Sequence, residues 1–187
     1  MVLRKRIARR GPPAIAALAT LFAGAGCAAT GPKVAAIDPA ALPSRAPWTV
    51  LVFFSPTCHC LEQHDGRLRA LYEAYHTRGV QFLMLDSEVH GTESRDESEA
   101  RRRGYPFPIV RDPGATLANE LGAQYATYSV VLDASGRVRY HVGIDSDKSH
   151  LHDDATPYLR SALDDVLAGR PVRIAEGKTL GCSLEKW

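Results

Sequence analysis

The sequence predicts one mixed α/β domain in which helices cover a central β-sheet, and three observations lead to this prediction. An unbroken run of β-forming residues spans 48–54, as in a strand that is covered on both faces. A second such run, at 80–85, follows a helical segment, and strands separated by a helix pair in parallel through a right-handed crossover. Two further runs, at 128–132 and 137–142, are joined by the turn 133–136. They predict a hairpin, which adds antiparallel strands to the sheet.

The head of the chain has the pattern of an export signal. Residues 1–26 contain five arginines and lysines and no acidic residue, and the apolar run 14–23 lies within them. This run is too short to span a bilayer but has the length of a signal-peptide core. The small residues 24–26 before Cys27 resemble a bacterial lipobox, in which the cysteine is acylated and becomes the mature N-terminus. We therefore expect a signal peptide over 1–27 with Cys27 as the lipidation site, and a plain secretory peptide cut near Cys27 as the alternative.

The segment that follows is expected to be a tether, residues 28–47, because its part 31–47 carries four prolines and little periodicity. The whole chain has a net charge of +2, but without the basic head the charge is −3. A mildly acidic domain does not suggest nucleic-acid binding. The expected location is the periplasmic side of a bacterial membrane, with the domain 48–187 held there by its lipid anchor.

The end of the first strand carries the most informative residues. Residues 55–56 break the strand, and Thr57 can cap a helix whose first residues include Cys58 and Cys60. Mixed α/β sheets place their sites at the C-terminal ends of central strands. At a helix N-terminus, the helix dipole and free backbone N–H groups also stabilise a thiolate. This turn is therefore the expected site.

The remaining elements follow from periodicity and from glycine and proline positions. The helix after the cysteines should end at Gly79. Residues 92–103 are almost wholly charged, which predicts a solvent-exposed helix rich in close ion pairs. A short strand at 107–110, a short helix at 115–121, a final helix at 156–168 and a tail at 169–187 that carries Cys182 complete the expected domain.

Several segments together show a family resemblance. They are FFSPTCHC at 53–60, GVQFLMLDSE at 79–88, FPIVRDPGATLANELGA at 107–123, VVLDASGRVRYHVGID at 130–145, LAGRPV at 167–172 and GCSLEKW at 181–187. With them the chain resembles the thioredoxin superfamily, and more closely its exported redoxin branch, which is related to AhpC/TSA proteins. The resemblance covers 48–187 and implies a thioredoxin-like fold with thiol–disulfide exchange as its chemistry.

The sequence departs from the superfamily pattern in three places. The usual C-x-x-C motif is one residue shorter here, as Cys58-His59-Cys60. The proline that usually faces the cysteines, commonly in the cis form, corresponds to Thr127 or Tyr128. The residues before Cys58 do not have the peroxiredoxin spacing, which favours disulfide exchange over peroxidase activity.

Thiol–disulfide exchange needs a reactive thiolate and a second sulfur within bonding reach. We expect Cys58 to be the nucleophile, and Cys60 or Cys182 to resolve the mixed disulfide. Cys182 can do so if the tail folds back, as the resemblance implies from the similar Gly-Cys endings of relatives. The expected substrates are protein or small-molecule disulfides, and no cofactor is required.

The alternative is a metal site on the same fold. Cys58, Cys60 and His64 lie within about one and a half helical turns, and thiolate with imidazole suits Cu(I) or Zn(II). The resemblance extends to Sco-type copper chaperones, which use two cysteines and a distant histidine, and His141 is the candidate for that histidine. A tethered binding module without catalysis is a third hypothesis, against which the two close thiols argue.

Overall fold

The computed structural model describes residue 42, residues 46–175 and residues 177–186, all within the compact unit Pro32–Trp187. The expected signal peptide, the lipidation site Cys27 and most of the expected tether lie outside these residues. Within the described part of the chain, no helix is both long enough and apolar enough to cross a membrane.

A five-stranded mixed sheet with the order β3-β2-β1-β4-β5 forms the centre of the domain. Strand β1 pairs in parallel with β2 and antiparallel with β4, so the strand that leads to the cysteines is central. Strand β3 pairs in parallel with β2, and β5 pairs antiparallel with β4. The predicted topology is therefore confirmed. The strands are β1 Trp48–Phe54, β2 Val80–Asp86, β3 Ile109–Arg111, β4 Ser129–Asp133 and β5 Val138–Val142.

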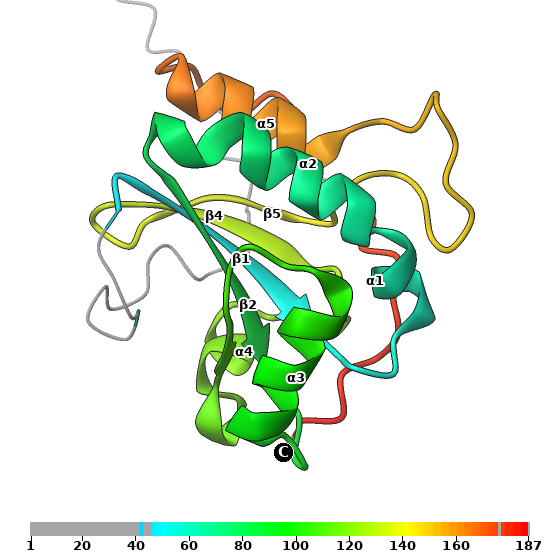
Figure 1. Cartoon of the computed structure of the whole chain (residues 1–187). Helices are drawn as coiled ribbons and strands as arrows, with labels where there is room; N and C mark the ends of the chain where they lie inside the picture. The colour runs from blue at the N-terminus through cyan, green and yellow to red at the C-terminus, as the bar shows by residue number, and fades with distance from the viewer. Residues whose placement is uncertain (1–41, 43–45, 176, 187) are drawn as a thin grey trace, which may run out of the picture. The chain divides into compact units, whose positions relative to one another are not determined.

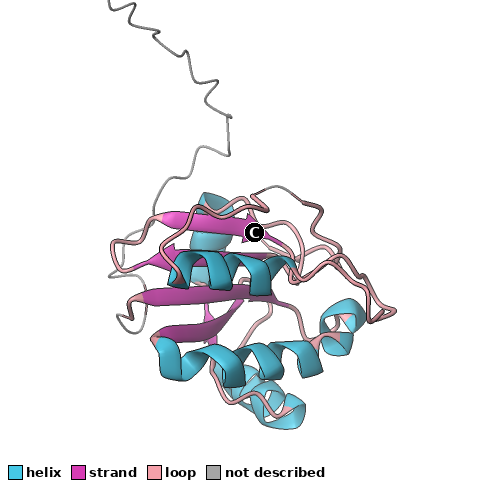
Figure 2. Ribbon diagram, turned by 90° about the horizontal axis from the view of Figure 1, so that it is seen from above, coloured by secondary structure: helices cyan, strands magenta, loops and turns pink. Residues whose placement is uncertain are grey.

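Helices cover this sheet (Figure 1). Helices α2 and α5 lie side by side over one face, as Figures 1 and 2 show, and the Tyr75 hydroxyl donates a hydrogen bond to Asp164 Oδ1 at 2.8 Å between them. Helix α3 lies near β3 at the edge of the sheet. The helices are α1 His59–Gln63, α2 Asp65–Tyr75, α3 Glu93–Arg103, α4 Thr116–Glu120 and α5 Tyr158–Leu167, with 3-10 turns at His76–Arg78 and Pro113–Ala115.

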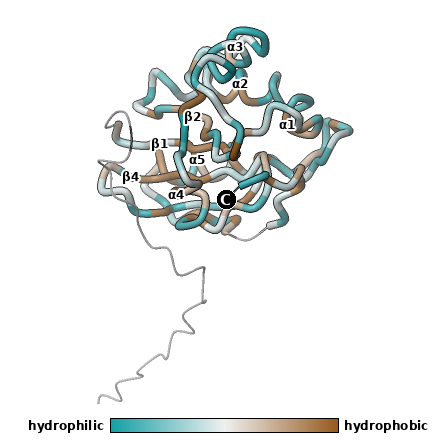
Figure 3. Tube along the Cα trace, turned by 90° about the horizontal axis from the view of Figure 1, so that it is seen from below, coloured by the Kyte–Doolittle hydropathy of each residue, from teal (hydrophilic) through white to brown (hydrophobic). Residues whose placement is uncertain are grey.

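The core follows from the strand sequences. Residues 49–54 of β1 are all buried, which confirms that this strand is covered on both faces. Figure 3 shows hydrophobic residues gathered in the strands and hydrophilic residues along α3. Side chains also alternate along β5, since Tyr140 and Val142 are buried and Arg139 is exposed.

The structure differs from the sequence prediction in three details. The helix after the cysteines is interrupted at His64, which separates α1 from α2, before Gly79 ends the segment with φ 81°. The cap of α1 is Cys58 itself and not Thr57, one residue later than expected. Helix α3 is not solvent-exposed all round, because its inner face buries Asp96 and Arg103.

Candidate functional site: a cluster of three cysteines

Cys58 lies at the junction of β1 and α1, where its backbone is extended (φ −79°, ψ 101°) and begins the helix. Its Sγ accepts a hydrogen bond from the Leu61 backbone N–H at 3.4 Å. This contact satisfies one of the free N–H groups of the first helical turn, as an N-cap side chain does. The apolar strand therefore delivers the sulfur directly to the helix N-terminus.

Two other sulfur atoms meet Cys58 at this point. The Sγ atoms of Cys58, Cys60 and Cys182 all lie within 4.8 Å of one another, and all three residues are free thiols. Cys58 is 1% exposed and Cys60 is 6% exposed, whereas Cys182 is partly exposed. The structure thus brings together the three cysteines that the sequence singled out, including the one on the tail.

Backbone hydrogen bonds hold the tail over the cluster. The Ala126 N–H donates to the Cys182 carbonyl at 2.9 Å, and on the same side the Leu184 N–H donates to Gln124 at 2.9 Å. On the other side, the Val89 N–H donates to the Glu185 carbonyl at 3.0 Å. In Figure 1 this segment, drawn in red, passes close to α1. The tail is therefore joined both to the loop after β2 and to the loop before β4.

Gly181 makes this approach possible. A Cβ atom at this position would lie 1.9 Å from the Ala126 carbonyl oxygen, which is a backbone atom that no rotamer change can remove. Next to it, Thr127 has φ 81°, a conformation that is rare and strained for a β-branched residue. Its N–H donates to Phe53 O at 3.0 Å, and its hydroxyl donates to Leu180 O at 3.2 Å. Thr127 thus joins β1 and the tail, at one of the two positions to which the sequence resemblance assigns the superfamily's proline.

Burial sets the proton affinity of the two inner thiols. Burial raises the pKa of Cys58 to about 12, and its hydrogen bond with Cys182 adds to this effect, although the Leu61 N–H acts in the opposite direction. Burial also raises the pKa of Cys60. The expectation of a stabilised thiolate at the helix N-terminus is therefore wrong for the closed, reduced cluster. The low-dielectric surroundings outweigh the helix contacts.

The expected histidine ligands are placed elsewhere. His64 is 1% exposed, with Nδ1 at 2.7 Å from the Cys60 carbonyl oxygen and Nε2 at 3.1 Å from Asp145 Oδ1. Since both ring nitrogens are occupied, His64 is not a metal ligand in this arrangement. His141, on β5, has its ring 6.4 Å from that of Tyr128. Among the described residues, Cys58 and Cys60 form a candidate metal-ligand group with Cys182. This group contains no histidine.

His64 instead fixes the break between α1 and α2. Burial lowers its pKa, but the hydrogen bonds to Asp145 and to the Cys60 carbonyl outweigh burial and leave the pKa raised. Arg67 Nη1 donates to Asp145 Oδ2 at 2.7 Å and to Asp147 Oδ2 at 2.9 Å. This chain of contacts connects the backbone of the second cysteine to the loop after β5.

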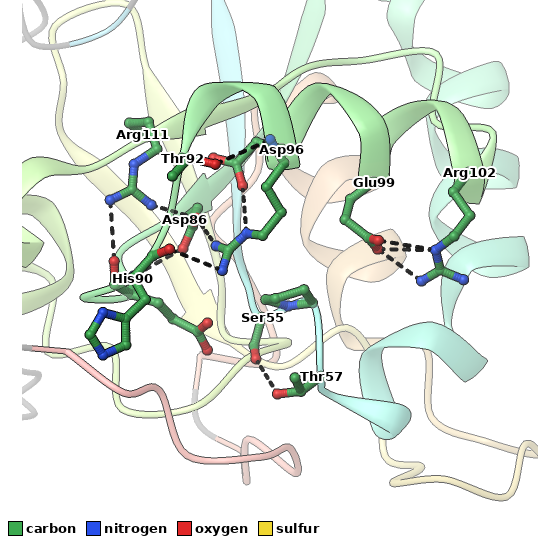
Figure 4. A network of polar contacts seen from close by, with 12 residues as sticks. Ser55, Thr57, Asp86, His90, Thr92, Asp96, Glu99, Arg102 and Arg111 are labelled. Atoms are coloured by element: carbon green, nitrogen blue, oxygen red, sulfur yellow. Dashed lines mark hydrogen bonds and ion pairs between the residues drawn. The ribbon is translucent and has the colours of Figure 1, made fainter.

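Sequence reasoning also missed a group of buried charges at the end of β2. Asp86 is 0% exposed, and its Oδ2 accepts hydrogen bonds from Arg111 at 2.5 Å and from Arg95. Figure 4 shows Asp86, Asp96 and Arg111 gathered near the N-terminal end of α3. Burial and the neighbouring Asp86 raise the pKa of Asp96 to about 7. Asp86 and Arg111 are partners in the parallel pairing of β2 and β3, so opposite charges at the ends of these two strands are the signal that could have found the pair.

Comparison with known proteins agrees with this architecture. The Redoxin family model matches residues 33–155, which include Cys58 and Cys60 but not Cys182. A hypothetical protein from Sinorhizobium meliloti superposes with a TM-score of 0.68 and 24% identity, over 75% of this chain and 80% of its own. An uncharacterized conserved protein from Geobacillus kaustophilus gives a TM-score of 0.65 and 25% identity, over 76% and 79% of the two chains.

A thioredoxin-like protein solved in its oxidized form is similar at the level of the fold, with a TM-score of 0.52 and 15% identity over 72% of this chain and 86% of its own. No curated protein matches the chain. The thioredoxin-like fold expected from the sequence is thereby confirmed.

Proposed function

The chain belongs to the Redoxin family, and on this basis we propose that it is an exported, membrane-tethered thiol–disulfide oxidoreductase. The family and the thioredoxin-like fold support a general redox function. One observation carries the specific proposal, namely the approach of the three Sγ atoms to within 4.8 Å of one another. Exchange requires a second sulfur that reaches the first with little movement, and this cluster supplies two.

The proposed reaction transfers two electrons. A thiolate of the reduced cluster attacks one sulfur of the substrate disulfide, which forms a mixed disulfide and releases one substrate thiol. A second cysteine of the cluster attacks the protein sulfur of this mixed disulfide, so that the other substrate thiol leaves and a disulfide forms within the protein. A dithiol donor from outside the protein then reduces this disulfide and is itself oxidised.

The cluster has three cysteines, so one of them remains a thiol whenever a disulfide forms between the other two. A disulfide between Cys58 and Cys60 closes a ring over a single intervening residue, where the required S–S dihedral angle is demanding. A disulfide between Cys58 and Cys182 joins two separate segments of the chain and has no such restriction. The arrangement therefore favours Cys182 as the partner of Cys58.

The proposed location rests on the head of the chain. A basic segment, an apolar run and small residues before Cys27 support export and acylation, and the proline-containing residues 28–47 would then separate the domain from the membrane. Outside the cytoplasm, thiols meet an oxidising environment, in which a disulfide exchange protein has substrates. Radiolabelled palmitate should enter the wild-type protein but not the Cys27→Ser variant.

Insulin reduction by the purified full chain tests the proposed activity. In a separate redox titration, the protein is equilibrated at a series of redox potentials, and its free thiols are trapped and counted by mass spectrometry. We expect a two-electron oxidation that removes two thiols of the domain. Cys58→Ser should abolish turnover, whereas Glu185→Gln, at an exposed side chain on the same tail, should leave turnover unchanged. Full activity in Cys58→Ser would falsify the assignment.

The same cluster supports a second candidate function, the binding of Cu(I) or Zn(II). Three thiolate sulfurs within 4.8 Å of one another are a donor set that soft metal ions prefer. This candidate replaces the expected ligands His64 and His141 by Cys182. It predicts about one equivalent of metal that is retained on purification and lost in Cys60→Ser, without disulfide turnover. Metal analysis on the sample used for the redox titration separates the two functions.

A further inference from the structure

We propose that Cys182, on the tail, is the sulfur that meets the substrate, and that Cys58 is the inner sulfur that completes the exchange. This inference rests on the proposed oxidoreductase function and assigns the order of its two steps. It reverses the order expected from the sequence, in which Cys58 attacks first and Cys182 resolves. Cys182 also lies outside the residues 33–155 that the family model matches, so family membership does not assign its role.

Cys182 is more accessible than the two inner cysteines. A substrate disulfide must bring one of its sulfurs into contact with the attacking sulfur, but Cys58 is 1% exposed and Cys60 is 6% exposed. Cys182 is partly exposed and lies within 4.8 Å of both inner sulfurs. A substrate can therefore reach Cys182 while the tail stays in place, whereas direct attack by Cys58 requires the tail to move away.

The fold also fixes the position of Cys182. Hydrogen bonds from Ala126 and Leu184 hold the tail on one side, and a hydrogen bond from Val89 holds it on the other. Gly181 lies where a side chain would overlap the Ala126 carbonyl oxygen. The backbone on both sides of Cys182 is thus fixed, as a residue that must present its sulfur in one direction requires.

A pocket beside the residues that follow Cys182 in the chain offers a place for the substrate. Its volume is about 240 Å³, and the two residues that follow Cys182 in the chain contribute to its lining: Ser183 and Leu184, together with Gln124, Tyr125 and Lys186. The Tyr125 side chain is 39% exposed, so its ring is available for contact with an apolar group. We infer that this pocket receives the residue next to the cysteine of a peptide disulfide.

The bonds balance in the proposed order. The Cys182 thiolate attacks the substrate disulfide, forms a mixed disulfide and releases the first substrate thiolate, which takes up a proton from water. The inner Cys58 thiol gives its proton to water and attacks Cys182 Sγ. A Cys58–Cys182 disulfide forms and the second substrate thiolate leaves. Cys60 remains a thiol throughout these steps.

The first test needs no substitution in the cluster. The reduced full chain is treated briefly with less than one equivalent of iodoacetamide under native conditions, and each cysteine-containing peptide is quantified by mass spectrometry. We expect Cys182 to be alkylated at least tenfold faster than Cys58 and Cys60. Alkylation of Cys58 before Cys182 would overturn the proposal.

The second test uses the chromogenic disulfide 5,5′-dithiobis(2-nitrobenzoate), in a Cys27→Ser background. The initial rate should fall at least tenfold in Cys182→Ser. The variant with both Cys58→Ser and Cys60→Ser should react with the wild-type rate constant, but it should release one equivalent of thionitrobenzoate where the wild type releases two, and it should retain a mixed disulfide. A wild-type initial rate in Cys182→Ser would contradict the assignment. Circular dichroism shows whether each variant is folded.

These outcomes separate the inference from the function on which it rests. If wild-type protein does not reduce insulin at all, the proposed function fails, whichever thiol is alkylated first. If the wild type reduces insulin and Cys182→Ser reacts with the chromogenic disulfide as fast as the wild type, the function stands and the order of the steps is wrong.

Discussion

Substitution of Gly181 by alanine should open the cysteine cluster without disrupting the rest of the fold. The added Cβ would lie 1.9 Å from the Ala126 carbonyl oxygen, so the tail must move away by more than about 1 Å to reach an ordinary contact distance. Two hydrogen bonds flank this point, from Ala126 N–H to Cys182 O at 2.9 Å and from Thr127 Oγ1 to Leu180 O at 3.2 Å. A displacement of this size takes both beyond hydrogen-bonding distance.

The expected magnitude follows from these two hydrogen bonds. Each contributes about 0.5–1.5 kcal/mol, so the docked tail should lose about 1–3 kcal/mol relative to the open one. Because about 1.4 kcal/mol corresponds to a factor of ten at equilibrium, the open population should rise by about 5- to 150-fold.

Alkylation of Cys58 by N-ethylmaleimide measures this opening, because Cys58 is 1% exposed while the tail is docked. The rate of alkylation in the reduced protein should increase by the same factor as the open population. Ser183→Ala is the matched control, since Ser183 is exposed and lies two residues away on the same tail. Equal rates in Gly181→Ala and the wild type, with both proteins folded, would refute the argument that this glycine allows the tail to dock.

Three further outcomes are expected. The Asp96 carboxyl has a pKa of about 7 in the folded protein but about 4 when unfolded. Its proton therefore stabilises the fold at low pH, and this contribution is lost as the pH rises through 7. The melting temperature should fall less between pH 5 and pH 8 in Asp96→Asn than in the wild type. His64→Phe should lower the free energy of unfolding by about 1–3 kcal/mol, measured by urea denaturation. Because the pKa of His64 is raised, its positive charge stabilises the fold below that pKa. The difference in the free energy of unfolding between the wild type and His64→Phe should therefore narrow as the pH rises. Tyr125→Ala should slow insulin reduction severalfold and leave iodoacetamide alkylation of Cys182 unchanged, and a parallel loss in both assays would contradict a role of the pocket in binding.

Most of the fold could be predicted from local sequence signals. The apolar run 48–54 identified a strand covered on both faces, and the structure places it in the centre of the sheet. Gly79 marked the end of the segment after α2, where its positive φ requires a residue without a side chain. These predictions hold because periodicity and backbone restrictions act within a few residues of the chain.

Contacts between distant residues could not be predicted in the same way. The spacing of Cys60 and His64 predicted that both lie on one helix, but His64 is the residue that ends α1. Its ring contacts the carbonyl oxygen of Cys60 and not the sulfur. The partner that orients its ring, Asp145, is 81 residues away in the chain. No local pattern carries this information, so the histidine was interpreted as a ligand when it is a fixed structural contact.

The prediction of a solvent-exposed helix at 92–103 was also partly wrong. A segment as polar as 92–103 is usually solvated, and most of its side chains are exposed or partly exposed. Asp96 is buried because the parallel strands β2 and β3 end near the start of α3. Their last residues, Asp86 and Arg111, lie close to Asp96 there. The burial of one residue in a charged helix depends on which strand ends lie under it, and this is a property of the assembled sheet.

Protein synthesis proceeds from the N-terminus, and the tail follows the last helix of the fold. A chain that is still emerging from a ribosome therefore presents Cys58 and Cys60 before Cys182 exists to cover them. During this interval the two thiols can react with any oxidant or foldase nearby. The cluster is complete only when the tail has docked, and a nonsense mutation just before Gly181 would leave every described helix and strand encoded but the sulfur cluster incomplete.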